Sequence, residues 1–239
     1  MRVRELNWMQ LADYLERDDR IVLPLGSTEQ HAYLSLETDN ILAERAAVEA
    51  AEPLGVPVLP VLPYGLTPAF AAFPGSPSLR VETFVAVLRD LLDSLYGQGF
   101  RRFLLVNGHG GNVPAGSLVR EWASARPDAQ AVFTSWWEND EFDVLTQSID
   151  AETRYGTWHA AWLENFPWTR LDGVELPEER KPVLDGAAYR VADAESVRHL
   201  LGDGSFGGPY QRPDEEMLRV WKVVVTGVRE LLETGWRLD

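Results

Sequence analysis

Short apolar runs alternate with helix-like segments through the first 135 residues, and this order constrains the fold more than any other feature. The apolar runs are residues 21–25, 103–106 and 131–136. Residues 6–15 and 81–96 repeat apolar side chains at three- and four-residue spacing, which is typical of a helix with one buried face. Alternation of this kind produces right-handed crossovers between parallel strands. It predicts an α/β fold, a three-layer α/β/α sandwich with a mostly parallel central sheet.

The remaining elements follow from local patterns. Residues 56–61 are apolar and β-branched but contain two prolines, which predicts a strand with distorted ends or an edge strand. The long, proline-rich stretch 63–79 is predicted to be a functional loop. Asp39 is expected to be the N-cap of the next helix. Further helices are predicted at residues 40–51, 113–125, 158–165, 192–201 and 214–233. The length fits one domain, residues 1–239.

Composition removes several classes of protein and of site. The chain has no cysteine, so a disulfide framework, a thiol nucleophile and a cysteine-ligated metal are excluded, and any metal must be held by histidine and carboxylate. Its net charge of −15 opposes nucleic acid and anionic membrane partners. No apolar run is long enough to span a bilayer, and we expect a cytoplasmic protein. The acidic stretches 138–143 and 175–179 are predicted to be solvated loops.

The histidines occupy unusual positions. His31 follows the first apolar run, in the segment Ser-Thr-Glu-Gln-His, and His109 lies in the glycine-rich segment after the second. Loops after the carboxyl ends of neighbouring parallel strands converge on one crevice, so Glu29, His31, Asp39 and His109 are predicted to share a site. In an extended segment, Glu29 and His31 point the same way, and Asp39 adds a carboxylate able to bridge two ions. Imidazole and carboxylate suit Zn, Mn, Fe or Co.

Each of these features has a simpler interpretation. An isolated histidine is most often an ordinary polar residue satisfied by a hydrogen bond. The segment Asn107–Asn112 is also typical of a glycine-rich turn, which can cradle phosphate at a helix N-terminus. Its glycine spacing does not match a dinucleotide fingerprint and no P-loop lysine is present, so phosphate binding is the weaker hypothesis.

Several motifs together resemble those of the creatininase family of metal-dependent amidohydrolases. They are Leu-Pro-Leu-Gly-Ser-Thr-Glu-Gln-His at residues 23–31, Thr-Asp at 38–39, Asn-Gly-His-Gly-Gly-Asn at 107–112, and His159 with Glu164. Their order and approximate separation match the family. A weaker similarity at residues 204–209 resembles the family's late Gly-Asp-Pro loop, so the resemblance runs from about residue 20 to about residue 220.

The resemblance implies a dinuclear centre of two divalent metal ions, with zinc expected and manganese or iron as alternatives. Glu29 and His109 would bind one ion, His31 and Glu164 the other, and Asp39 would bridge them. His159 would lie beside the metals as an acid/base or substrate-orienting residue. The family also implies a homo-oligomer, with a hexamer favoured.

Two departures from the family pattern argue against creatinine as the substrate. Family members usually continue Glu-Gln-His-Gly-Pro-His-Leu-Pro, whereas residues 32–36 are one residue shorter and lack the second histidine. Creatininase also carries a glutamate where this chain has Gly111. We therefore expect hydrolysis of a C–N bond in a small amide, cyclic amide or formamide through a metal-bound water. The alternatives are a non-catalytic α/β small-molecule-binding protein that has lost full metal binding, and a metal-dependent isomerase or phosphoesterase on the same ligands.

The candidate substrate-binding residues are aromatic or flexible. The chain has nine tryptophans, and core or interface packing explains most tryptophans in proteins. Trp136 lies at the carboxyl end of the third apolar run and Trp158 adjoins His159, so these two are predicted to form walls of a substrate pocket. Gly110 and Gly111 complete the predicted pocket.

Overall fold

The protein is described by a computed structural model that covers residues 1–152, 159–184 and 186–236. Its centre is a parallel sheet of three strands, β1 (Arg20–Leu25), β2 (Arg102–Asn107) and β3 (Gln130–Ser135), in the order β1-β2-β3. The register pairs Leu25 with Asn107 and Asn107 with Ser135, so the three strands end at the same edge. The loops that follow them all leave from that edge.

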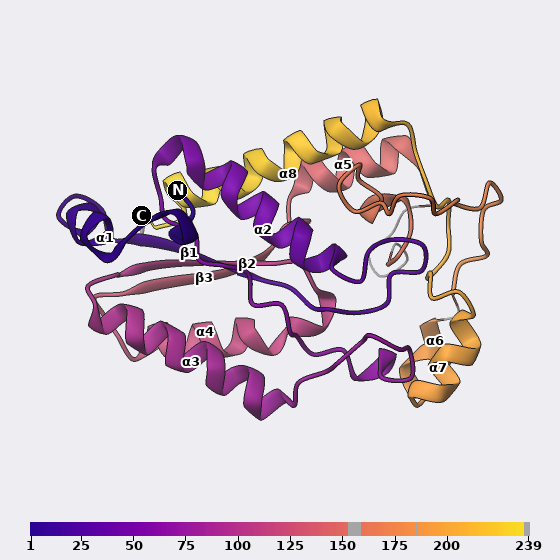
Figure 1. The fold of residues 1–239 in the computed structure, drawn as a ribbon, viewed down its shortest axis with the longest axis horizontal. Coiled ribbons are helices and arrows are strands. Elements are labelled where there is room, and N and C mark those ends of the chain that lie inside the picture. Colours follow the sequence, from indigo (N-terminus) through magenta and orange to yellow (C-terminus); the bar gives the residue numbers. More distant parts are fainter. Residues whose placement is uncertain (153–158, 185, 237–239) are drawn as a thin grey trace.

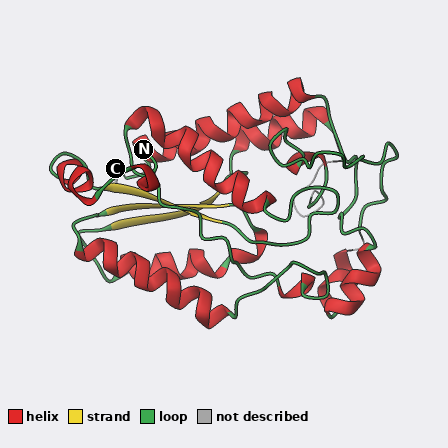
Figure 2. Ribbon diagram, viewed as in Figure 1, coloured by secondary structure: helices red, strands yellow, loops and turns green. Residues whose placement is uncertain are grey.

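Helices cover both faces of the sheet, which confirms the three-layer α/β/α prediction (Figure 1). One face carries α2 (Thr38–Ala51), α5 (Asp140–Ile149) and α8 (Asp214–Thr234). The other carries α3 (Val81–Gly97) and α4 (Pro114–Ser124). The short helix α1 (Trp8–Leu15) lies beside the amino ends of the strands, and α6 (Gly186–Val191) and α7 (Ala194–Leu201) lie at the opposite end of the molecule (Figure 2).

Alternation along the strands divides the core into two clusters. Val22 and Leu104 pack in the cluster that includes residues of α2 and α8. Leu23 and Leu105, their neighbours in the chain, pack in the cluster that includes residues of α3 and α4. Because both faces of these parallel strands are buried, the strands are continuous apolar runs in the sequence, and this is why they were predictable.

One predicted strand and one predicted loop differ from the structure. No strand forms at residues 56–61; isolated parallel bridges join Val58 to Arg2 and to Val22, and Leu62 to Leu25. The prolines at 57 and 60 remove donors from a continuous ladder, which explains the difference. The acidic stretch 138–143 is not a solvated loop, because α5 begins within it and Phe142 is buried. Residues 175–179 form a largely exposed loop, as predicted.

Two helix predictions near the site were wrong. The described part of 158–165 contains only a 3-10 turn, Trp162–Glu164, because its apolar residues pack in the core instead of on one helical stripe. Asp39 is not an N-cap: α2 begins at Thr38, with Glu37 as the N-cap, so Asp39 lies in the first turn and its side chain is free for other contacts. No helix in the described part of the chain is both long enough and apolar enough to cross a bilayer.

The loop after β2 approaches α2 closely at Gly108. A Cβ atom on this residue would lie 2.3 Å from the backbone oxygen of Asp39 and 3.1 Å from the Cβ of Ala43. Only glycine lets the loop and the helix meet at this distance. The approach brings the first turn of α2 next to the loop that carries His109.

We expect Gly108→Ala to lower the free energy of unfolding by about 1–3 kcal/mol, because the added methyl group overpacks this contact. Chemical denaturation measures the change. Gly110→Ala is the matched control, since a Cβ there meets nothing within 4 Å, and it should change the stability by no more than about 0.5 kcal/mol. Equal losses in the two variants would contradict the packing argument.

Candidate metal centre

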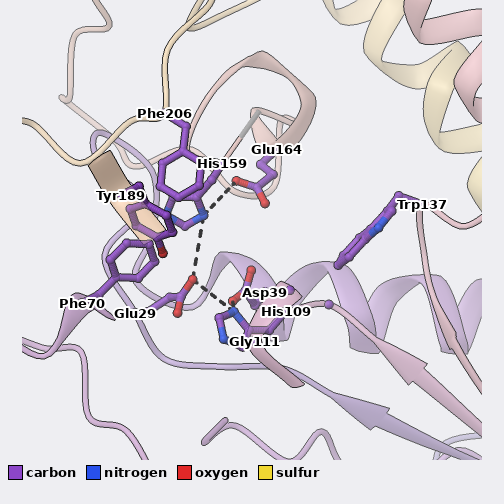
Figure 3. Close-up of a pocket in the computed structure, with 12 residues that line it drawn as sticks. Glu29, Asp39, Phe70, His109, Gly111, Trp137, His159, Glu164, Tyr189 and Phe206 are labelled. Atoms are coloured by element: carbon purple, nitrogen blue, oxygen red, sulfur yellow. Dashed lines mark ion pairs between the residues drawn. The ribbon is translucent and has the colours of Figure 1, made fainter. Parts of the chain in front are cut away.

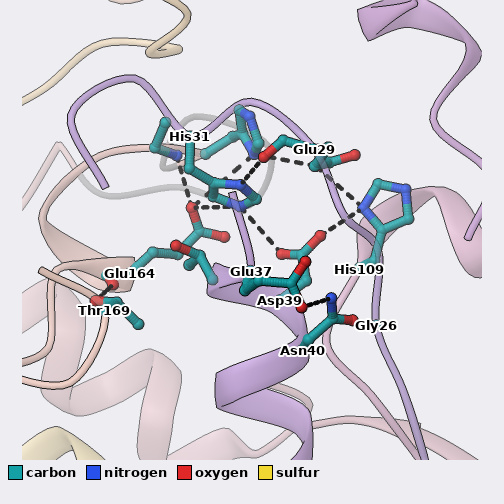
Figure 4. Close-up of polar contacts among 12 residues, drawn as sticks. Gly26, Glu29, His31, Glu37, Asp39, Asn40, His109, Glu164 and Thr169 are labelled. Carbon is teal, nitrogen blue, oxygen red and sulfur yellow. Dashed lines mark hydrogen bonds and ion pairs between the residues drawn. The ribbon is translucent and has the colours of Figure 1, made fainter. Parts of the chain in front are cut away.

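Four segments of the chain bring the candidate metal ligands together at the carboxyl edge of the sheet (Figure 4). They are the loop after β1, the first turn of α2, the loop after β2, and the 3-10 turn at 162–164. All five side chains are buried, with residue exposures of 6% or less: Glu29, His31, Asp39, His109 and Glu164. The convergence predicted from the strand order is therefore present in the folded chain.

Asp39 lies at the centre of this cluster. Its Oδ1 is 3.0 Å from Nε2 of His31, and its Oδ2 is 3.0 Å from Nδ1 of His109. Oε1 of Glu29 lies 3.2 Å from Nδ1 of His109, and Oε2 of Glu164 lies 3.6 Å from Nε2 of His31. Among the described residues, two groups of three ligand atoms share Asp39, namely Glu29–Asp39–His109 and His31–Asp39–Glu164, and a third group joins Glu29, His31 and His159.

The outer nitrogens of both histidines are bonded to backbone carbonyls. Nδ1 of His31 lies 3.1 Å from the oxygen of Glu29, and Nε2 of His109 lies 2.9 Å from the oxygen of Leu66. A carbonyl only accepts, so these outer nitrogens carry a hydrogen, and in the neutral ring the nitrogen that faces the cluster is the one with the lone pair. This arrangement is typical of histidines that bind metals.

Asn112 holds the backbone of Leu66 in place, and Gly111 leaves room for the carbonyl of Leu66. The backbone N–H of Leu66 donates to Oδ1 of Asn112 over 3.1 Å, and Asn112 in turn donates to the oxygen of Gly26 over 3.0 Å. A Cβ on Gly111 would lie 2.0 Å from the oxygen of Leu66 and 2.4 Å from Nε2 of His109. A side chain at position 111 is therefore incompatible with the bond that orients His109.

Burial and the closeness of the charged groups shift the pKa values in the cluster. Burial disfavours the charged form of His31, but the carboxylates of Asp39 and Glu164 outweigh it and raise the pKa of His31 to about 10. Burial raises the pKa of Glu164 to about 7. Both carboxylate oxygens of Glu29, Oδ2 of Asp39 and Nε2 of His31 are buried without a hydrogen-bond partner. Such atoms are costly unless a cation satisfies them, so this donor set fits divalent metal ions.

His159 lies beside the two ligand groups. Its ring is farther from their carboxylates than the rings of His31 and His109 are. Its Nδ1 is 3.8 Å from Oε1 of Glu29 and 3.9 Å from Oε2 of Glu164, while its Nε2 lies 3.1 Å from the backbone oxygen of Gln30. The ring stacks on Phe70, with centroids 4.8 Å apart and planes at 19°. Burial and the charge of His31 hold the pKa of His159 well below its usual range.

The backbone is strained directly after two histidines of the site, His31 and His159. Ala32 and Ala160 have φ values of 50° and 54°, and they directly follow His31 and His159. They are the non-glycine residues with positive φ in the described part of the chain. The backbone N–H of Ala160 donates to Oε2 of Glu164 over 2.6 Å, which ties the strained turn to a candidate ligand.

A cavity of about 370 Å³ opens over the cluster (Figure 3). Its floor is formed by the carboxylates and His109, and Gly110 and Gly111 line it as predicted. The aromatic residues of its walls are Phe70, Trp137, His159, Tyr189 and Phe206. Figure 3 shows Phe70, Tyr189 and Phe206 grouped around His159, with Trp137 on the other side of the carboxylates.

The tryptophan prediction was wrong in part. Trp136 does not line the cavity; it is buried in the core, with ring contacts to Phe142 and Phe166. Its neighbour Trp137 lines the cavity instead, while its ring also contacts that of Trp136 in the same core cluster. Trp158 lies outside the described residues.

Besides Trp137, three wall residues were not identified from the sequence. Phe70 comes from the long loop predicted to be functional, and Phe206 from the glycine-rich segment at 204–209. Those two local signals pointed to the right segments but not to the aromatic residues. Tyr189, on α6, had no signal at all, because only tertiary packing brings that helix over the site.

Known proteins resemble this chain in sequence and in structure. The family model described as "Creatininase: Creatinine amidohydrolase" matches residues 4–232. The creatinine amidohydrolase of Pseudomonas putida is 32% identical over 114 residues, which are 45% of this chain and 44% of that protein. The mycofactocin precursor peptide peptidase of Mycobacterium tuberculosis (strain H37Rv) is 36% identical over 187 residues, 67% of this chain and 68% of that protein. The match thus spans less than half of the first relative and about two thirds of the second.

Solved creatininase structures share the fold. A mutant creatininase complexed with creatine superposes with a TM-score of 0.81 at 22% identity, over 98% of each chain. Creatininase structures described as the Zn-Zn type and as the Mn form match with TM-scores of 0.76 and 0.77. With a family model that matches nearly its whole length and a fold shared with these structures, the chain belongs to the creatininase family.

Proposed function

We propose that the protein is a metal-dependent amidohydrolase that cleaves the C–N bond of a small amide, cyclic amide or formamide. This proposal rests on two buried sets of ligands, each made of carboxylates and an imidazole, that share Asp39. The backbone carbonyls behind His31 and His109 support it, because they leave both site-facing nitrogens ready to bind a cation.

The ligands divide into two sets. Glu29, Asp39 and His109 would hold one ion, and His31, Asp39 and Glu164 the other. When bound, two such ions activate a water molecule for attack and polarise the scissile carbonyl. Zinc or manganese suits this donor set, and related structures are described as containing each.

His159 is proposed to move the proton. The lowered pKa favours the neutral ring, which would accept a proton from the attacking water and pass it to the leaving nitrogen. Burial and the neighbouring charge of His31 cause this lowering of the pKa. The stack on Phe70 and the contact with Gln30 fix the ring while Nδ1 faces the carboxylates.

The cavity favours an amide over the alternatives. Among the described residues that line it there is no lysine or arginine to neutralise a phosphate, which argues against a phosphoesterase. The complete ligand set, despite the shortened loop after His31, argues against a binding protein that has lost its metals.

The first prediction concerns metal content. Asp39→Ala removes the carboxylate shared by the two groups and should lose most of the bound metal. His199→Ala is the control, because His199 is exposed on α7, and it should keep the metal. Elemental analysis of protein purified without chelator gives the ratio, and equal metal content in the two variants would refute a dinuclear centre.

The second prediction separates proton transfer from metal binding. His159→Ala should keep both ions and lose about 10²–10⁴ in kcat, the usual range for a removed acid/base group. Glu164→Ala should lose one ion and nearly all activity. His159 also forms a possible ligand group with Glu29 and His31. If His159→Ala loses as much metal as Glu164→Ala, His159 is a ligand and the acid/base group lies elsewhere.

The third prediction concerns assembly. Family membership supports a homo-oligomer, with a hexamer favoured, although most described tryptophans pack inside the chain's own core. An exception is Trp8 on α1, which is 75% exposed and offers a large apolar contact. Sedimentation at micromolar concentration should give a multiple of 26.9 kDa, and a 26.9 kDa species alone would contradict the proposal.

A further inference from the structure

A second cavity adjoins the candidate metal centre, and hydrolysis of a small amide leaves it without a role. It measures about 330 Å³ and shares four lining residues with the first cavity, namely Phe70, His109, Gly111 and Tyr189. The two cavities therefore meet at a candidate metal ligand and at two aromatic rings. A substrate whose amide lies over the carboxylates has room to extend past these rings.

The rest of the second cavity is mostly apolar. Its remaining lining residues are Leu66, Thr67, Pro68 and Ala69 from one loop, and Val81 and Pro114 from the first turns of α3 and α4. No carboxylate, lysine or arginine lines it among the described residues. Val81 is 53% exposed, so the wall it forms adjoins solvent. The charged donors thus lie in the first cavity and the apolar surface in the second.

The size and chemistry of the second cavity define what fits there. An apolar protein cavity of about 150 Å³ holds a benzene molecule, and this one is larger. A charged group placed there would lose its hydration without gaining a partner. An apolar group gains free energy by leaving water, and the rings of Phe70 and Tyr189 provide flat surfaces for it.

From this juxtaposition we infer that the substrate is an amide that carries an uncharged aromatic or aliphatic substituent, which binds in the second cavity. The inference rests on the proposed function and narrows its substrate class. Phe70 and Tyr189 contact both parts of such a substrate, and the residues lining only the second cavity determine specificity.

Steady-state kinetics with a matched set of amides tests the inference. The set is acetamide, 3-phenylpropanamide, N-benzylacetamide and the negatively charged succinamate. We expect kcat/KM for at least one of the two aromatic amides to exceed that for acetamide and for succinamate at least tenfold, the order that apolar pockets supply. The two aromatic amides place the substituent on opposite sides of the bond, so they also show which side enters the cavity.

Val81→Trp fills the second cavity from its exposed wall and should lower the preference for the aromatic amide over acetamide at least tenfold. Val144→Trp is the matched control, because Val144 is 72% exposed on α5, away from both cavities, and it should keep the preference. The absence of an aromatic preference, a preference that Val81→Trp leaves intact, or equal losses on both substrates would overturn the inference.

A binding measurement separates failure of the inference from failure of the proposed function. Benzyl alcohol has no bond that this reaction cleaves, and saturation-transfer NMR reports its binding to the metal-loaded protein. Wild type and Val144→Trp should give a signal that Val81→Trp loses. If no amide is hydrolysed but this pattern is seen, the proposed reaction fails and the apolar site stands; if wild type gives no signal, the apolar site is refuted.

Discussion

The carboxylate of Asp39 contacts histidines from two separate loops, and the rest of the site is arranged around it. One oxygen reaches His31 after β1 and the other reaches His109 after β2, each over 3.0 Å. This requires the first turn of α2 to lie between the two loops. Gly108 permits the approach, because any side chain there would collide with the backbone of Asp39. A backbone contact thus fixes the geometry of a side-chain cluster.

Hydrogen bonds behind the cluster hold its side chains in their orientations. His109 is oriented by Leu66, Leu66 by Asn112, and Asn112 by the backbone at Gly26. On the other side, Gln30 contacts His159 and donates to the oxygen of Gly204. These bonds connect the loops after β1 and β2 to the chain's late glycine segment. Because each side chain is held by its neighbours, the candidate ligand atoms converge without rearrangement.

The late glycine segment is itself fixed by a partly buried ammonium group. Nζ of Lys181 donates to the backbone oxygens of Leu201 and Ser205 and to the carboxylate of Asp203, and the hydroxyl of Tyr210 donates to the same carboxylate. Phe206 lies inside this segment and contacts His159, with ring centroids 4.9 Å apart. The aromatic wall of the cavity therefore depends on polar contacts that lie outside it.

Local sequence patterns predicted the elements correctly where both faces of a strand are buried. They failed where the orientation of a side chain decides its contacts. The strands were predictable because both their faces are buried, and the convergence of their loops follows from parallel topology. The segment 158–165 has helical spacing, yet Trp162, Leu163 and Phe166 pack around a 3-10 turn because the core accepts them in that arrangement. Trp136 and Trp137 are neighbours of the same residue type and pack in the same core cluster, yet of the two only Trp137 also lines the cavity.

The sequence by itself determined the fold class, the order of the donor residues along the chain and the family, because these depend on apolar periodicity and on short motifs within single loops. The tertiary structure alone decided that Asp39 faces two histidines instead of capping its helix, and which nitrogen of each histidine faces the site. It also decided the aromatic walls, since Phe70, Tyr189 and Phe206 come from distant segments. The physical reason is that side-chain direction and long-range contacts are set by packing between elements, which no local pattern contains.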